Sequence, residues 1–205
     1  MAALPKALLW RRLDATGTEL VLVDDAAGVH ARGTLTASTP VPFVCQYELY
    51  TDDAWVTARF DATVEGAGFR RVVRLERAAS RWRVTASEQG DLDAALEAAG
   101  RPRAGAPGAE DPDRLRSALD VDLGYSPLTN TLPLRRLAPL TPDVNHPVEV
   151  AWVLLPGLEV VPNTQTYASL GPDRVRFTSG SFTADIMIDA EGYVTHYPGL
   201  AERVG

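Results

Sequence analysis

The chain has 205 residues, of which 45% are hydrophobic and 23% are charged, proportions typical of a soluble globular domain. Its formal net charge of −7 argues against nucleic-acid binding, which needs a basic surface. A single cysteine and three histidines exclude an internal disulfide and a zinc site built on several cysteines, so we expect neither a metal nor a cofactor.

Membrane insertion and secretion are not indicated by the hydrophobic pattern. No apolar run reaches the ~18 residues that a membrane-spanning helix needs. The N-terminal MAALPKALLWRRL has an apolar run that is too short for a secretory signal and contains Pro5. We therefore expect a cytoplasmic protein with no transmembrane segment.

The first 87 residues have the pattern of successive β-strands. Apolar and polar residues alternate through VTARFDATV, which places Val56, Ala58 and Phe60 on one predicted face. The turns between the runs are short, which predicts antiparallel pairing. The predicted strands in this half are residues 8–13, 18–24, 28–37, 43–51, 56–64, 69–77 and 81–87.

Residues 88–117 interrupt this pattern. DLDAALEAA has apolar residues at helical spacing, which predicts a short helix. GRPRAGAPGAE has the composition of a flexible linker, and Asp111 is placed to cap a turn that begins at Pro112. We interpret the segment as a flexible and partly helical insertion in a loop. A lid over a ligand is the alternative.

Strands return after residue 147. The predicted strands are residues 148–155, 158–161, 164–168, 174–178, 182–189 and 193–198. Roughly a dozen strands and no helix–strand alternation predict a mainly β protein, organised as one domain over residues 1–205. A sheet of this size must curl, split or close.

Residues 120–137, DVDLGYSPLTNTLPLRRL, do not follow the strand pattern. Ser126 and Pro127 are suited to begin a helix, and Pro133 would interrupt it, so we expect one short helix or two turns in series. We predict that the sheet wraps around this leucine-rich element. Arg135 and Arg136 then lie near the interior and need a partner.

Two interpretations of the arginine pair remain open. One is a structural ion pair with Asp120 or Asp122. The other is a fork that binds a phosphate, a carboxylate or a sugar hydroxyl of a ligand.

The second half of the chain resembles a bacterial family, the putative glycolipid-binding family. The motifs are DVDLGYSPLTNTLPLRRL, VEVAWVLLPGLEV, QTYASL and FTADIMIDAEGYVTHYPGLAER, which together span residues 120–203. The first half matches more loosely, through Trp10, Tyr47, Trp55 and Trp82. The resemblance implies a spiral β-roll, a large antiparallel sheet around a single central helix. It also implies a homodimer, and a shape similar to periplasmic lipoprotein carriers.

A sheet that wraps on a helix can leave a concave apolar cleft, which is the usual form of a small-ligand site. A sugar head group requires aromatic faces and planar hydrogen-bonding groups. The candidate ligand-binding residues are Asp122, Tyr125, Asn130, Arg135, Arg136, Trp152, Gln165 and Tyr167. The alternative for the aromatic residues is a place in the core, and for Asn130 a local bond to the backbone.

We expect a non-enzymatic protein that binds a glycolipid or another small amphiphile in this cleft. The sequence contains no G-x-S-x-G, H-E-x-x-H or P-loop motif. One alternative is an enzyme that uses Asp120, Asp122 or His196 as acid or base in the same cleft. The other is a structural or scaffold domain in which residues 120–137 only stabilise the fold.

Overall fold

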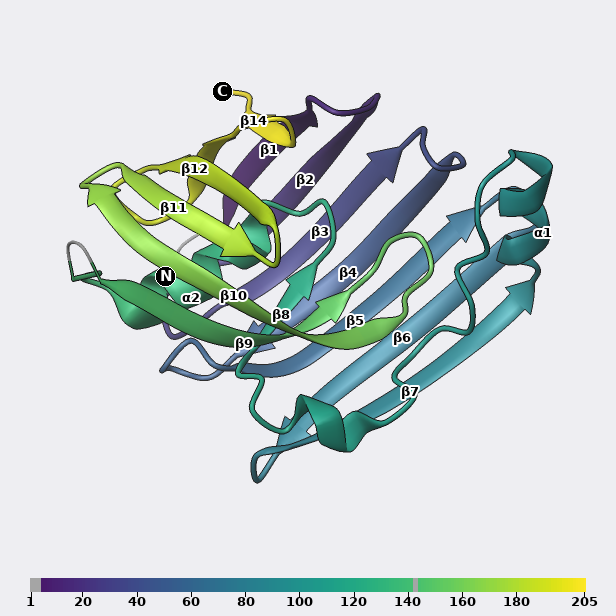
Figure 1. Cartoon of the computed structure of the whole chain (residues 1–205), viewed down its shortest axis with the longest axis horizontal. Helices are drawn as coiled ribbons and strands as arrows, with labels where there is room; N and C mark the ends of the chain where they lie inside the picture. Colours follow the sequence, from purple (N-terminus) through teal and green to yellow (C-terminus); the bar gives the residue numbers. More distant parts are fainter. Residues whose placement is uncertain (1–4, 142–143) are drawn as a thin grey trace.

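A computed structural model of the chain describes residues 5–141 and 144–205 (Figure 1). The strands are β1 (Lys6–Arg12), β2 (Gly17–Asp24), β3 (His30–Ala37), β4 (Phe43–Thr51), β5 (Thr57–Gly66), β6 (Phe69–Ala78), β7 (Arg81–Gly90), β8 (Asp120–Leu123), β9 (Asn145–Val153), β10 (Val160–Gly171), β11 (Arg174–Ser179), β12 (Phe182–Ile188), β13 (Val194–Tyr197) and β14 (Ala201–Arg203). The helices are α1 (Leu92–Ala98) and α2 (Thr131–Leu137), with the 3-10 helices η1 (Pro112–Leu115) and η2 (Leu128–Asn130).

The 14 strands of the described residues form one sheet in the order β7-β6-β5-β4-β3-β2-β1-β14-β13-β12-β11-β10-β9-β8. The C-terminal strand β14 pairs with β1, so the second half of the chain continues the sheet that the first half begins. All pairs are antiparallel except β8 and β9, which are parallel. The mainly β prediction is confirmed.

Two features of the predicted architecture are corrected. The sheet is mixed rather than wholly antiparallel, because β8 reaches β9 through the helical segment and not through a hairpin. It has two unpaired edges, β7 and β8, and is neither closed nor strongly curled. The described residues contain two short α-helices, α2 in the predicted central segment and α1 in the insertion, where a short helix was also predicted.

The strands of the first half follow the alternation of their side chains. Cys45, Tyr47 and Leu49 of β4 face the core. The predicted face of residues 56–64 changes at a register shift in the β4–β5 pairing, where Thr51 pairs with Thr57. Thr57 is therefore buried and Ala58 is exposed, contrary to the uninterrupted alternation.

In the second half, β10 merges two predicted strands into one. Pro162 lies inside it and pairs with Ala151 of β9. Pairing with β11 begins only at Gln165. Pro162 therefore has a strand on one side only, the position in which a sheet tolerates a residue without an N–H.

The insertion has the predicted helix and turn. The Asp91 carboxylate caps α1 through the Ala94 N–H at 2.9 Å, and Asp111 caps η1. Further along, Gly108 exchanges backbone hydrogen bonds with Leu158 and Val160, which joins the segment to the connection between β9 and β10. None of its residues lines the two large cavities described below.

The core consists of two clusters, and the η2–α2 segment contributes to both. Leu128 and Leu132 belong to the larger cluster, and Leu134 belongs to the smaller one. In Figure 1 the strands β8–β12 cross in front of β1–β5, and the larger cluster contains residues from both halves. Of the two predicted alternatives, the structure has two short helical elements in series, and their leucines are buried. Pro133 was expected to interrupt a helix, but it lies in the first turn of α2, where its missing N–H has no helical partner to lose.

Polar contacts also join the two halves. The indole N–H of Trp10 donates to the Val194 carbonyl at 2.8 Å, and that of Trp82 donates to the Ala118 carbonyl at 3.1 Å. The buried Arg71 guanidinium donates to the Gly157 carbonyl at 3.0 Å. No helix of the described residues has the length and apolar character required to cross a bilayer.

Candidate functional site

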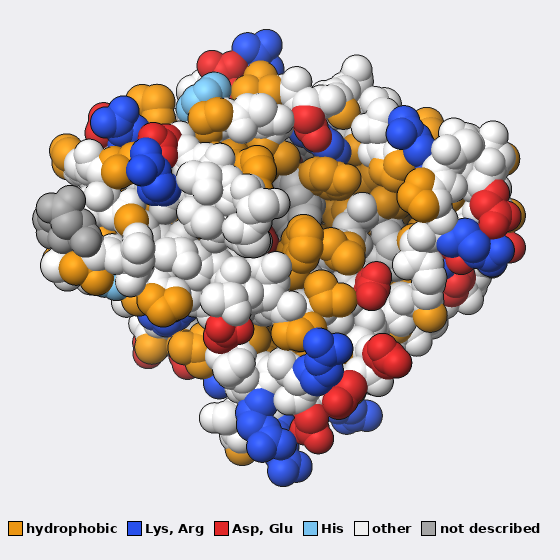
Figure 2. Space-filling view, in the orientation of Figure 1, with side chains coloured by type: hydrophobic (Ala, Val, Ile, Leu, Met, Phe, Trp, Pro, Cys, Tyr) orange, Lys and Arg blue, Asp and Glu red, His pale blue; other side chains and the backbone are white. Residues whose placement is uncertain are grey.

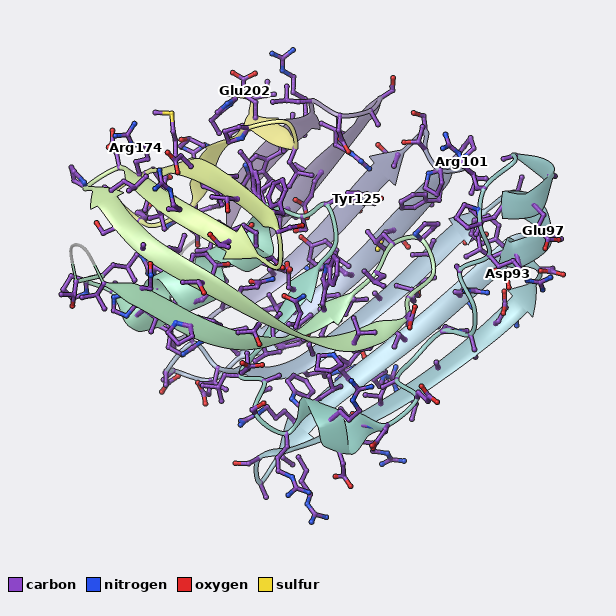
Figure 3. The ribbon with its side chains drawn as sticks, in the orientation of Figure 1. Asp93, Glu97, Arg101, Tyr125, Arg174 and Glu202 are labelled. Carbon is purple, nitrogen blue, oxygen red and sulfur yellow. The ribbon has the colours of Figure 1, made fainter. Side chains whose placement is uncertain are left out.

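A cavity of about 570 Å³, here called the aromatic cavity, lies among β8, β9, β10, the β11–β12 hairpin and the β13–β14 turn. Its lining is mostly apolar and includes five aromatic side chains. They are Tyr125, Trp152, Phe177, Phe182 and Tyr197. Figure 2 shows a hollow with hydrophobic side chains around it near the centre of this face, and Figure 3 places Tyr125 beside that hollow.

Register explains why two of the lining residues meet. Asp122 of β8 pairs with Trp152 of β9 in the parallel ladder, so both side chains point to the same face of the sheet. On β10, Gln165 and Tyr167 are two residues apart and both point into the interior. Gln165 therefore reaches the cavity wall, and Tyr167 lies behind it.

A hydrogen-bonded network forms the polar floor of the aromatic cavity. Gln165 Nε2 donates to Asp122 Oδ2 at 2.6 Å, and the Tyr167 hydroxyl donates to Gln165 Oε1 at 3.2 Å. Asn130 Nδ2 donates in turn to the Tyr167 oxygen at 2.9 Å. Thr129 Oγ1 donates to the other Asp122 oxygen at 2.9 Å. Asn130 thus bonds to a distant side chain, in contrast to the local alternative.

The Asp122 carboxyl has no positive partner in this network. Removal from water raises its pKa, and the hydrogen bonds from Thr129 and Gln165 oppose that rise. The described lining residues of the aromatic cavity include no Lys, Arg or His. The floor is consequently a hydrogen-bonding surface with one acidic group.

Tyr125 is held in an unusual backbone conformation at the rim of the cavity. Its φ angle is 69°, a left-handed value that is rare for a bulky residue. The Arg12 guanidinium lies 4.0 Å from the centre of its ring, and Arg12 itself forms an ion pair with Asp14. The stacked arginine covers one face of the ring.

Neither predicted arginine lines the aromatic cavity. Arg136 forms an ion pair with the buried Asp120. For this arginine the first of the two interpretations, a structural ion pair, is the one that the structure shows. Burial raises the pKa of Asp120 to about 6, against the opposing effect of the Arg136 charge. Asp120 Oδ1 has no hydrogen-bond partner.

Arg135 lines a second, wider cavity of about 1100 Å³, here called the Arg135 cavity. Its guanidinium lies 4.6 Å from the ring centre of Trp55 and donates to the Glu191 carbonyl at 2.9 Å. Asp25 lies 3.9 Å away. The structure therefore separates the predicted site residues: Arg135 lines this second cavity, and Arg136 lines neither cavity and pairs with Asp120. Asp122, Tyr125, Asn130, Trp152 and Gln165 line the aromatic cavity, with Tyr167 behind them.

Sequence reasoning missed Glu19 on β2. It is buried, and its Oε1 accepts hydrogen bonds from the Tyr47 hydroxyl and from Ser126 Oγ, each at 2.6 Å. Ser126 was predicted to cap a helix, but η2 has Pro127 as its N-cap and no side-chain cap. The available signal was a glutamate at the core-facing position of GTELVLVD, in phase with the two buried valines.

The alternative catalytic residues are dispersed. Asp120 is paired with Arg136, and His196 on β13 lines neither of the two large cavities. Asp122 alone is at the wall of the aromatic cavity. The described residues contain no cluster of three or more His, Cys, Asp and Glu side chains placed to bind a metal ion.

A solved structure and a family model match the chain. The chain is similar to a crystal structure of a DUF1089 family protein from Pseudomonas aeruginosa, with 23% identity and a TM-score of 0.71 over 91% of this chain and 92% of that chain. At this identity the similarity concerns the fold. No curated protein matches the chain. The family described as "Putative glycolipid-binding" matches residues 7–203, and the chain belongs to this family.

Proposed function

We propose that the chain binds an amphiphilic small molecule of the glycolipid class in the aromatic cavity, without a chemical step. The observation that carries the proposal is the placement of a polar network, Asp122–Gln165–Tyr167–Asn130, under a rim of aromatic and aliphatic side chains. A cavity with an apolar lining and a few convergent polar groups is the usual form of a small-molecule site. The family description supports the same class of ligand.

The polar end of the ligand is placed at the floor. Sugar hydroxyls both donate and accept hydrogen bonds, and the Asp122 carboxylate and the side-chain amides of Asn130 and Gln165 offer both kinds of partner. The aromatic faces around them suit the apolar faces of a sugar ring. Arg135 and Arg136 are not part of this proposal, because they line another cavity or pair with Asp120.

The apolar end of the ligand is placed toward the rim. Phe182 is 49% exposed at the start of β12, and Leu154, Leu155 and Leu200 lie near it in the lining. An acyl chain gains ~0.8 kcal/mol for each CH₂ that it buries.

An enzyme in the same cavity is the second candidate, and one observation favours it. Asp122 is a carboxyl group with a raised pKa at a cavity wall, the combination expected of a general acid or base. It has no histidine, lysine or second carboxylate beside it in the lining. Binding is therefore the better-supported function, because an enzyme would need a second catalytic group that the described lining does not provide.

Calorimetric titration with n-dodecyl-β-D-glucoside, below its micelle concentration, tests the proposal. We expect saturable binding with one site per chain. Gln165→Leu removes a donor and an acceptor from the floor, and we expect it to lower the affinity about tenfold. Leu140→Ala in the Arg135 cavity is the matched control and should leave the affinity unchanged. If the glucoside does not bind, or if Leu140→Ala is the variant that weakens it, the proposal is wrong.

A further inference from the structure

We propose that the head group bound in the aromatic cavity carries a protonated amine, and that Asp122 is its counter-ion. This inference rests on the proposed function and narrows it from amphiphiles in general to cationic ones. The family description assigns no charge to the ligand, and the sequence-based candidates that would favour an anion, Arg135 and Arg136, lie outside this cavity. Three features of the cavity support a positive one.

The first feature is that Asp122 lacks a counter-charge. Its two oxygens accept hydrogen bonds from neutral groups, Thr129 and Gln165, and no ion pair involving it is found among the described residues. Asp120, two residues earlier on the same strand, has Arg136 as its partner. A carboxylate that is removed from water is unfavourable until a cation joins it. A ligand ammonium would supply the missing charge.

The second feature is the aromatic lining. Five aromatic side chains and one carboxylate line the cavity. Ammonium groups are attracted to the faces of aromatic rings, and such rings with an acidic group form typical sites for amines and quaternary ammonium ions. A neutral sugar would stack on the same rings, but it would leave the charge of Asp122 uncompensated.

The third feature is the distribution of positive charge. No Lys, Arg or His of the described residues lines the cavity, and the nearest stacked guanidinium, that of Arg12, lies on Tyr125 and is paired with Asp14. A phosphate or carboxylate head group would therefore face Asp122 with no cationic side chain in the lining to bind it. The net charge of −7 also favours the approach of a cation.

Three amphiphiles with the same dodecyl tail test whether the cavity prefers a cationic, a neutral or an anionic head group. They are dodecylamine, n-dodecyl-β-D-glucoside and dodecyl phosphate, each titrated at neutral pH below its micelle concentration. We expect the amine to bind at least about tenfold more tightly than the glucoside, and the phosphate to bind most weakly. This comparison uses the unaltered protein, so it does not depend on whether a variant folds.

Two variants test whether the preference for the amine depends on Asp122. Asp122→Asn should lower the affinity for dodecylamine about tenfold more than it lowers the affinity for the glucoside. Glu65→Gln removes the same charge from an exposed position of β5 outside the cavity and should change neither affinity. An equal loss in Glu65→Gln would assign the preference to net charge and overturn the inference.

The failures of the two proposals are distinguishable. If the glucoside binds as tightly as the amine, or the phosphate binds more tightly than either, the cationic head group is wrong and the amphiphile site stands. If none of the three amphiphiles binds, both proposals are wrong.

Discussion

The Ser126 hydroxyl donates a hydrogen bond to Glu19 Oε1 at 2.6 Å, between two residues that are 107 positions apart in the chain. The Tyr47 hydroxyl donates to the same oxygen, and Glu19 Oε2 is buried without a hydrogen-bond partner. Ser126 lines the aromatic cavity. A titratable group on β2 therefore fixes one wall of the candidate site to the first half of the sheet.

The first prediction concerns the pH dependence of stability. Burial raises the pKa of Glu19 from 4.5 to about 7 in the folded protein. The folded state thus holds this proton more firmly than the unfolded state does. The resulting stabilisation is complete below about pH 4.5 and is lost as the pH rises through about 7, by about 3 kcal/mol in total.

Urea unfolding of the native chain and of Glu19→Gln, at pH 5 and at pH 8, measures this effect. Other groups titrate in both proteins and cancel in the difference. We expect Glu19→Gln to gain stability relative to the native chain on going from pH 5 to pH 8. A difference that stays constant with pH would show that Glu19 does not titrate in this range.

The second prediction separates the two neighbouring arginines. Arg136→Ala leaves Asp120 buried without its cation and should lower the free energy of unfolding by about 3–5 kcal/mol. Arg135→Ala removes a partly exposed guanidinium that lies on Trp55 and should cost about 1 kcal/mol or less. Thermal unfolding of both variants compares them. Equal losses of stability in the two variants would contradict the conclusion that Arg136 neutralises a buried charge and Arg135 does not.

Arg135 and Arg136 also show which parts of the candidate site could be predicted from the sequence. The leucines of residues 120–137 predicted a buried element, and a buried arginine was predicted to need a partner, with Asp120, Asp122 and an anionic ligand as the candidates. Consecutive residues of a helix point about 100° apart, so Arg135 and Arg136 leave α2 in different directions. Which of them enters the core depends on how α2 packs, and the spacing alone does not decide that.

Glu19 and the buried faces of the strands show what else could and could not be predicted from the sequence. The buried face of β4 follows its alternating apolar residues, because a strand repeats every two residues whatever its neighbours are. The register shift opposite Thr57 depends on the partner strand and had no local signal. Glu19 was visible as a charge at an apolar position, but its partner Ser126 lies beyond the reach of any local pattern.

The third prediction concerns the floor of the aromatic cavity. Tyr167→Phe removes the hydroxyl that lies between Asn130 and Gln165, and leaves a buried Asn130 donor unsatisfied. We expect a loss of stability of about 1–3 kcal/mol. Tyr50→Phe removes a more exposed hydroxyl from β4 and should cost less than about 0.5 kcal/mol. Similar values for the two variants, measured by urea unfolding, would argue against a cooperative network.

The fourth prediction concerns the rim. Phe182 is 49% exposed and lines the aromatic cavity. Phe182→Ala should therefore weaken the binding of n-dodecyl-β-D-glucoside several-fold while the melting temperature changes by only a few degrees. Met187→Ala is the control, because Met187 is 43% exposed on the same strand and lies outside the cavity. The rim has no role in binding if both variants bind the glucoside equally well.

The four tryptophans of the chain provide the most direct measurement of where a ligand binds. Trp152 lines the aromatic cavity, Trp55 lines the Arg135 cavity, and Trp10 and Trp82 are buried elsewhere. Their indole N–H signals, assigned with Trp→Phe variants, are followed by proton–nitrogen correlation NMR during titration with n-dodecyl-β-D-glucoside. We expect the Trp152 signal to move to saturation while the Trp55 signal stays in place. Movement of the Trp55 signal with a stationary Trp152 signal would contradict the assignment of the site.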